Sequence, residues 1–205
     1  MKSPAERAAR VRLLVLDVDG VLTDGGLYYG PDGEELKRFD VQDGLAIVEA
    51  QRAGLAVAII SGRRSVAVDR RAAELGIAEV HQGISDKAAA LEALRERLGF
   101  APTDLAVMGD DLPDLPLMRR AGLSLAPVNA VTEVRRVAQW VSRRPGGCGA
   151  VRDAIEWLLR ARRAWPPPSA EPEGRGAPQP ESRRSAAGGR FPRRKSAPGT
   201  RPTST

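Results

Sequence analysis

Two pairs of aspartates have the types and positions of metal-binding and phosphate-handling residues. Asp17 and Asp19 follow a branched aliphatic run over residues 11–16, and Asp110 and Asp111 end a later apolar run. Carboxylates two residues apart in an extended segment point to the same side and repel each other, unless they share a proton or a divalent cation. An all-oxygen ligand set favours Mg²⁺, because zinc sites in proteins are built mainly from histidine and cysteine. The aspartates therefore predict a magnesium site.

A phosphate bound at such a site needs neutral hydrogen-bond donors and a cation in addition to the metal ion. Ser61 and Gly62 follow the apolar run over residues 55–60, and Lys87 lies near the start of a predicted helix over residues 85–99. The hydroxyl, the backbone amide and the ammonium group supply what a phosphate requires. We therefore predict that Ser61, Gly62 and Lys87 bind phosphate.

Other catalytic chemistries lack the residues that they need. The sole histidine, His81, lies inside a predicted strand, where a structural role is expected. The sole cysteine, Cys148, lacks the surroundings of a cysteine-based phosphatase and cannot form an intramolecular disulfide. Ser61 has no histidine nearby in the sequence to act as its base. A carboxylate remains as the candidate nucleophile.

The elements that must position these residues alternate between strand and helix. The strands are continuous apolar runs, which indicates a Rossmann-like α/β fold, a parallel sheet with helices on both faces. Ligands of such sheets bind beyond the carboxyl ends of the strands, where Asp17, Ser61 and Asp110 are expected. The stretch LYYGPDGEEL over residues 27–36 predicts a short β-hairpin. Helices are also expected over residues 43–54, 65–76, 113–122, 131–138 and 150–165, and Ser85 is the expected N-cap of the helix over 85–99.

Length and composition predict one domain over residues 11–165, after an N-terminal extension over residues 1–10. The N-terminus lacks the apolar segment of a secretory signal, and no run is long enough to span a membrane, so a cytoplasmic protein is expected. The net charge of +6 suggests nucleic-acid binding, but residues 166–205 hold eight lysines or arginines and three glutamates. This basic, proline- and arginine-rich tail is expected to be disordered, and nucleic acid is not an expected partner.

Four motifs in order resemble those of the haloacid dehalogenase superfamily of phosphohydrolases. They are DVDGV at residues 17–21, IISGR at 59–63, DK at 86–87 and GDDLPDLPLM at 109–118. DVDGV matches the first motif of that superfamily, DxDx[TV], in full. The stretches DGLAI, VHQGISDK, APVNA and GGCGAVRD are similar to members without a cap domain that act on the 8-phosphate of 3-deoxy-D-manno-octulosonate. The closer resemblance covers residues 10–160 and leaves out the basic tail.

This resemblance implies a role for each matching residue. Asp17 would attack phosphorus and form an aspartyl-phosphate, while Asp19 would protonate the leaving sugar oxygen and then deprotonate the hydrolytic water. Mg²⁺ would be held by Asp17, the Asp19 carbonyl and Asp110, and Asp111 and Asp114 would orient these ligands. The residues implied to bind the transferring phosphoryl group are Ser61, Gly62 and Lys87.

The resemblance also implies a sugar-acid phosphate as substrate, bound by Thr23, Arg63 and Arg71. No cap domain fits between the motifs, so a homotetramer is expected to close the site with neighbouring hairpins and the glycine-rich C-terminal segment over residues 146–153. Three alternatives stay open at this point. They are a nine-carbon sialic-acid 9-phosphate as substrate, a non-catalytic oligomerisation module related to sugar-nucleotide synthetases, and nucleic-acid binding through the tail alone.

Overall fold

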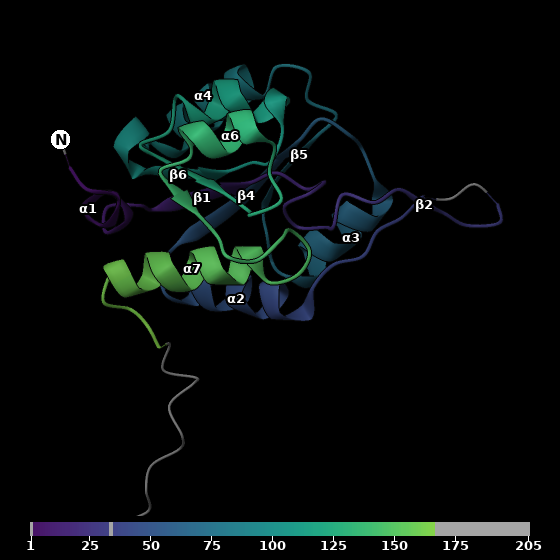
Figure 1. Cartoon of the computed structure of the whole chain (residues 1–205), viewed down its shortest axis with the longest axis horizontal. Helices are drawn as coiled ribbons and strands as arrows, with labels where there is room; N and C mark the ends of the chain where they lie inside the picture. The colour runs from purple at the N-terminus through teal and green to yellow at the C-terminus, as the bar shows by residue number, and fades with distance from the viewer. Residues whose placement is uncertain (1, 33–34, 167–205) are drawn as a thin grey trace, which may run out of the picture. The chain divides into compact units, whose positions relative to one another are not determined.

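The computed structural model describes residues 2–32 and 35–166, and these residues contain a six-stranded parallel sheet (Figure 1). Across the sheet the strands follow the order β5-β4-β1-β6-β7-β8. Because β1 lies between β4 and β6, the order of connection reverses there, and such a point leaves a crevice at the carboxyl ends of the strands. The strands are β1 (Leu13–Leu16), β4 (Ala56–Ser61), β5 (Glu79–Gln82), β6 (Leu105–Met108), β7 (Leu123–Ala126) and β8 (Trp140–Val141).

Helices cover both faces of the sheet, as the sequence predicted (Figure 1). One face carries α1 (Pro4–Ala8), α2 (Val41–Arg52), α3 (Val66–Glu74) and α7 (Ala150–Ala161). The opposite face carries α4 (Lys87–Leu98), α5 (Leu115–Met118) and α6 (Thr132–Val137). Two short 3₁₀ turns, η1 (Pro102–Asp104) and η2 (Leu112–Asp114), flank β6.

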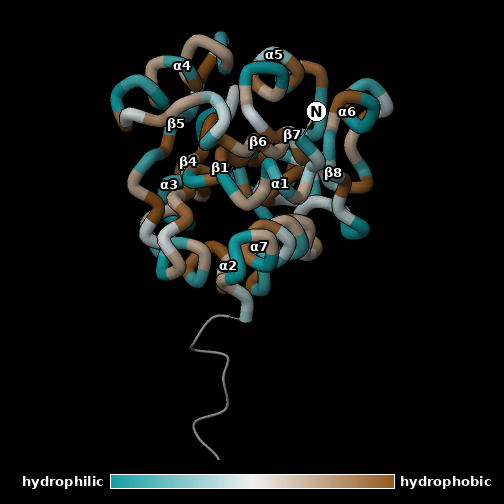
Figure 2. Tube along the Cα trace, turned by 90° about the vertical axis from the view of Figure 1, so that its left-hand side faces the viewer, coloured by the Kyte–Doolittle hydropathy of each residue, from teal (hydrophilic) through white to brown (hydrophobic). Residues whose placement is uncertain are grey.

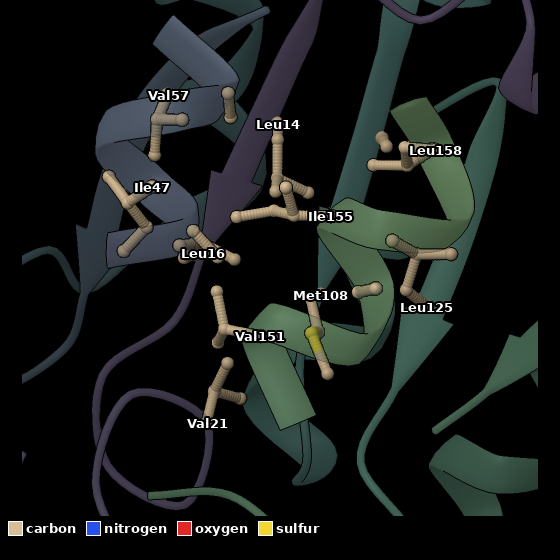
Figure 3. Packing of buried hydrophobic residues seen from close by; sticks show 14 of the residues in the cluster. Leu14, Leu16, Val21, Ile47, Val57, Met108, Leu125, Val151, Ile155 and Leu158 are labelled. Carbon is tan, nitrogen blue, oxygen red and sulfur yellow. The ribbon is translucent and has the colours of Figure 1, made fainter. Parts of the chain in front are cut away.

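The central strand β1 is buried on both faces because successive side chains of a strand point in opposite directions. Leu14 packs with Ile47 of α2 and Ile155 of α7 (Figure 3). Leu13 packs with Leu91 of α4 in the second core, on the other face. Figure 2 shows the same layering, with hydrophobic stretches at the strands between helices in which hydrophilic and hydrophobic residues alternate. The continuous apolar run that leads to the first aspartate pair is thus a fully buried strand.

The helix that carries Lys87 begins one residue later than the sequence suggested. The expected N-cap, Ser85, is wrong, because the Asp86 side chain accepts the hydrogen bond from the Ala89 amide at 2.9 Å. An aspartate carboxylate caps a helix as well as a serine hydroxyl does. The helix ends at Gly99, whose φ of 69° is the left-handed conformation that glycine adopts readily. Lys87 is therefore the first helical residue.

Two boundaries differ from those expected. Residues 1–10, expected as an extension, include α1, and its Ala8 is fully buried in the core, so the packed domain begins before residue 11. The single helix expected over residues 113–122 is instead η2 followed by the four-residue α5. Pro113 and Pro116 lack amide donors, which prevents a continuous ladder of helical hydrogen bonds there. The expected tail lies outside the described residues from residue 167 onward.

The predicted hairpin is confirmed and projects from the body of the fold (Figure 1). Its strands β2 (Tyr28–Tyr29) and β3 (Glu35–Leu36) pair antiparallel, with Tyr28 opposite Leu36. The chain between Asp19 and Ser61 holds this hairpin, α2 and β4 and no cap domain in its described part. None of the described helices is both long and apolar enough to cross a membrane.

Candidate active site

A cleft of about 340 Å³ lies where β1, β4 and β6 end. The backbone amide of Asp17 donates to the carbonyl of Met108 at 3.0 Å, which ties the residue after β1 to the end of β6. The residues predicted from the sequence that line this cleft are Asp17, Asp19, Ser61, Gly62, Arg63, Lys87, Asp110, Asp111 and Asp114. The meeting of three strand ends that the sequence suggested is therefore present in the fold.

The Lys87 ammonium group joins two carboxylates at the floor of the cleft. Its Nζ donates to Asp17 Oδ1 at 2.6 Å and to Asp114 Oδ1 at 2.7 Å. All three side chains are less than one-tenth exposed. Burial, and then the charge of Asp114, raises the pKa of Asp17 to about 6, although Lys87 acts in the opposite direction. The candidate nucleophile is thus held in place by an ion pair and is short of compensating positive charge.

Asp114 also shapes the loop that carries Asp110. Its Oδ2 accepts hydrogen bonds from the backbone amides of Asp110 at 3.0 Å and Asp111 at 3.3 Å. The Asp111 side chain turns away to cap η2, where it accepts from the Leu112 amide at 2.7 Å. Asp114 therefore contacts both the ammonium group of Lys87 and the loop after β6, whereas Asp111 contributes its backbone.

The side chain of Asp110 has the features of a cation ligand. Its Oδ1 is buried and has no hydrogen-bond partner among the described residues. Burial, and then the charges of Asp17 and Asp114, raises the pKa of Asp110 to about 7. Gly20, with a φ of 90°, brings its backbone so close to Asp110 that a Cβ at this position would overlap the carboxylate. This close packing against Gly20 therefore fixes the orientation of the Asp110 carboxylate and of its unpartnered oxygen.

The donor set fits Mg²⁺. Carboxylate oxygens of Asp17, Asp110 and Asp114 lie within 4.8 Å of one another. Three carboxylates face one ammonium group, so a divalent cation would relieve the excess negative charge, and oxygen ligands are those that Mg²⁺ prefers. The side chain of Asp19 is not in this group. The Asp19 carboxylate accepts a hydrogen bond from Lys37 instead. The backbone carbonyl of Asp19 is therefore the atom of this residue that is expected to bind the metal ion.

Two of the three residues expected to contact substrate do not line the cleft. Thr23 is 1% exposed, and its hydroxyl donates to the Val18 carbonyl and accepts from the Gly20 and Gly25 amides. Arg71 lies on α3, where it donates to Glu74 at 3.2 Å and to the Asp40 carbonyl at 3.4 Å. The side chains of Thr23 and Arg71 thus make hydrogen bonds within their own chain, outside the cleft. Arg63 alone of the three lines the cleft.

Residues 146–149 of the glycine-rich segment pack closely against the loop over residues 20–24 of their own chain. A Cβ on Gly146 would collide with the carbonyl of Gly20, and a Cβ on Gly147 would collide with the backbone of Thr23 and Asp24. The Gly147 amide also donates to the Val21 carbonyl at 3.1 Å. The segment therefore supports the loop that follows the first aspartate pair.

Two charged residues near the cleft, Glu35 and Lys37, were missed by the sequence reasoning. Lys37, just after β3, places its Nζ 2.5 Å from Asp19 Oδ1 and 2.5 Å from Glu35 Oε1. Arg63 Nη2 donates to Glu35 Oε2 at 3.2 Å. Residues two apart in a strand share a face, so the Glu35 and Lys37 spacing was the available signal. What it could not reveal is that this face turns toward Asp19.

The fold and the cleft together define an uncapped haloacid dehalogenase-like hydrolase. The family model described as haloacid dehalogenase-like hydrolase matches residues 72–155. The chain is 47% identical over 156 residues to the 3-deoxy-D-manno-octulosonate 8-phosphate phosphatase of Escherichia coli (strain K12). The matched residues cover 76% of this chain and 83% of that protein. The chain is 45% identical over 157 residues to the phosphatase of the same name from Yersinia pestis, covering 77% and 84%.

A solved structure has the same fold and a related sequence. It is the 3-deoxy-D-manno-octulosonate 8-phosphate phosphatase from Moraxella catarrhalis in complex with a magnesium ion, a phosphate ion and 3-deoxy-D-manno-octulosonate. It matches with a TM-score of 0.77 and 42% identity, over 78% of this chain and 92% of that one. The chain belongs to the 3-deoxy-D-manno-octulosonate 8-phosphate phosphatase family. Both the resemblance and the α/β fold predicted from the sequence are confirmed.

Proposed function

We propose that this protein hydrolyses 3-deoxy-D-manno-octulosonate 8-phosphate to the free sugar acid and phosphate, with Mg²⁺ as its cofactor. The observation that carries the proposal is the buried Lys87 ammonium group between Asp17 and Asp114, beside the unpartnered oxygen of Asp110. Phosphoryl transfer depends chiefly on positive charge and on positioning around the phosphoryl oxygens, and these groups supply both. Family membership supports the choice of substrate.

Each step of the proposed reaction has a residue to perform it. An oxygen of Asp17 attacks phosphorus, the bond from phosphorus to the sugar oxygen breaks, and Asp19 gives that oxygen a proton. Water then attacks the aspartyl-phosphate, Asp19 takes a proton from it, and phosphate leaves as the bond to Asp17 breaks. Asp17, Asp110 and the Asp19 carbonyl would hold Mg²⁺, which would supply positive charge to balance the phosphoryl oxygens. In the same scheme Asp111 and Asp114 orient these ligands.

The phosphoryl group is proposed to bind beside Lys87, at the end of β4. Ser61 is 3% exposed, and its carbonyl accepts from the Ile84 amide at 3.0 Å, which fixes the strand end at the cleft wall. Its hydroxyl and the Gly62 amide are the neutral donors of the site. Arg63, which is 47% exposed at the mouth, is the proposed contact for the substrate carboxylate. Thr23 and Arg71 are left out of this proposal.

Two alternatives are weaker on specific observations. A non-catalytic oligomerisation module would not be expected to keep the buried ion pairs of Lys87, whose desolvation is costly without a use. A nine-carbon sugar-acid 9-phosphate also has a carboxylate and a phosphate. The length of substrate that fits between Arg63 and Asp17 must decide between the two sugar acids.

We also propose a homotetramer in the cytoplasm. Hairpin residues Leu27, Tyr29 and Leu36 are all more than half exposed, and an isolated two-stranded hairpin needs a surface to pack against. A second copy of the chain would provide that surface over an uncapped cleft. A single cysteine, Cys148, suits a reducing compartment.

The direct test measures phosphate release from a panel of sugar-acid phosphates, with and without Mg²⁺. We expect the eight-carbon 8-phosphate to be hydrolysed fastest and only when Mg²⁺ is present. Asp17→Asn should abolish turnover, because an amide is a poor nucleophile. The variant should melt no lower than the wild type, because it removes a buried charge beside Asp114. A variant that keeps its activity, or a wild type that prefers the nine-carbon substrate, would contradict the proposal.

A further inference from the structure

Four charged side chains form a ring at the mouth of the cleft: Asp19, Glu35, Lys37 and Arg63. Lys37 contacts one oxygen of each carboxylate, at 2.5 Å from Asp19 Oδ1 and 2.5 Å from Glu35 Oε1. Arg63 lies nearest the other oxygen of each, at 3.2 Å from Glu35 Oε2 and 3.7 Å from Asp19 Oδ2. Each carboxylate is thus shared between two cations. The ring connects the hairpin to the loops that follow β1 and β4.

The two cations of this ring are in different environments. The Lys37 side chain is 1% exposed, whereas that of Arg63 is 47% exposed. Burial acts to lower the pKa of Lys37, but its bonds to Asp19 and then to Glu35 outweigh burial and keep that pKa above its ordinary value. A buried ammonium group is stable only with its partners in place, because an unpaired buried charge costs several kcal/mol. The contact between Lys37 and Asp19 is therefore strongly constrained, and the contact of Arg63 is loose.

This arrangement leaves the two oxygens of Asp19 in unequal positions. Oδ1 is held by the buried ammonium group, and among the described residues Oδ2 has only the exposed guanidinium of Arg63, at 3.7 Å. A bond to one oxygen fixes the rotation of a carboxyl group. It leaves the second oxygen to carry the proton that an acid–base residue must give and take back.

We propose that Lys37 is a positioning residue that holds the Asp19 carboxylate toward the substrate, so that the hairpin takes part in catalysis within its own chain. The inference rests on the proposed acid–base role of Asp19. Lys37 itself does not line the cleft and acts through Asp19. A hairpin that only shields the cleft would have no need of a buried cation bonded to Asp19.

The test compares two leaving groups in the Mg²⁺-loaded enzyme. A sugar oxygen needs a proton as it leaves, whereas p-nitrophenolate leaves without one. Lys37→Met should lower kcat for the sugar-acid phosphate by about 10- to 100-fold, a part of the usual contribution of acid–base catalysis, and kcat for p-nitrophenyl phosphate by less than about threefold. Lys37→Arg should recover most of the loss. If Lys37→Met melts far below the wild type, Lys37→Gln replaces it as the polar variant.

A matched control removes the neighbouring cation. The Arg38 side chain is 54% exposed and lies near Asp24, not Asp19. Arg38→Met should therefore leave the ratio of the two activities unchanged. Equal losses on both substrates for Lys37→Met would mean that the lysine serves only the fold, and would overturn the inference.

A double-mutant cycle separates this inference from the proposed function. In an Asp19→Asn background there is no acid left to position, so adding Lys37→Met should change kcat by less than about twofold. Full additivity of the two losses would overturn the positioning role. If instead Asp19→Asn alone impairs both substrates equally, the acid–base role of Asp19 fails. The cycle then still reports whether Lys37 acts through Asp19.

Discussion

At the scale of single residues, the site is a set of carboxylates with too little positive charge. Lys87 donates hydrogen bonds to Asp17 and Asp114, whereas no described residue donates one to Asp110 Oδ1. The raised pKa values of Asp17 and Asp110 have the same origin, burial next to like charges. Such a cluster is stable in the folded protein only because packing holds it together, and a bound cation would stabilise it further.

Substituting Asp110 tests this reasoning about charge. Asp110→Asn should raise the Mg²⁺ concentration needed for half-maximal activity by at least about tenfold, because a charged ligand is lost. The metal-free variant should melt no lower than the wild type, because one of three repelling carboxylates is gone. Addition of Mg²⁺ should raise its melting temperature less than that of the wild type. Thermal melts over a MgCl₂ titration measure both effects.

Asp104→Asn is the control, because Asp104 lies in η1 before β6, accepts from the Ala101 amide at 3.0 Å and does not line the cleft. Its response to Mg²⁺ should stay close to that of the wild type. If both variants respond alike, the aspartate with the unpartnered oxygen has no special part in metal binding.

At the scale of elements, one buried carboxylate on α2 holds the N-terminus of α7. Asp43 is 1% exposed, and its two oxygens accept from the Arg152 amide at 2.7 Å and the Gly149 amide at 3.3 Å. The bonds satisfy amides of the first turn of α7, which no residue within the helix can satisfy. The segment just before α7 packs against the loop over residues 20–24. Asp43 therefore helps to place a helix and, through it, a wall of the site.

The pKa of Asp43 yields a prediction with a definite sign. Burial raises this pKa from 3.8 to about 6, against its bonds to Arg152 and Gly149. Between these values the folded protein holds more protons than the unfolded chain, so the free energy of unfolding falls as the pH rises. A rise from 3.8 to about 6 corresponds to about 3 kcal/mol. Asp43→Asn removes this dependence.

Urea unfolding of the metal-free protein between pH 4 and pH 7 measures how Asp43 makes the free energy of unfolding depend on pH. The free energy of unfolding of the wild type minus that of Asp43→Asn should decrease over this range, because Asp43 loses its proton in the folded protein. The contributions of Asp17 and Asp110 are common to both proteins and cancel in this difference. Asp153→Asn is the matched control on α7, where Asp153 accepts from Ser142 and the Arg143 amide. A difference that does not change with pH would show that Asp43 is ionised in the folded protein throughout.

At the scale of the whole molecule, exposed apolar side chains gather on the elements around the cleft. Leu27 and Tyr29 of the hairpin are 51% and 63% exposed, and Val66 at the start of α3 is 83% exposed. The hairpin extends away from the sheet and its helices (Figure 1). Surfaces of this kind are commonly buried between subunits.

Charges placed on this surface should break the proposed oligomer. The double variant Leu27→Asp with Tyr29→Asp is expected to shift the sedimentation profile toward monomer and to lower activity, because buried apolar contacts are replaced by like charges. Val128→Asp, at a side chain that is 40% exposed after β7, should leave the assembly intact. A wild type that sediments as a monomer and is fully active would end the proposal of an active tetramer.

Much of the site could be predicted from sequence because it depends on one rule of parallel sheets. Asp17, Ser61 and Asp110 each follow a buried apolar strand, and the carboxyl ends of such strands meet at one edge. Local rules did less well where two neighbours had similar propensities, as at Ser85 and Asp86. The sequence order alone cannot choose between equivalent caps.

By itself, the sequence determined the alternation of strands and helices, the meeting of the aspartates and the chemistry that they support, because these follow from local patterns and strand order. Only the tertiary structure decided which side chains turn toward one another. Asp43 meets the amide of Arg152 across 109 positions, and Lys37 reaches Asp19 from a hairpin with no core of its own. Such contacts depend on the rotation and packing of whole elements, which no local pattern encodes.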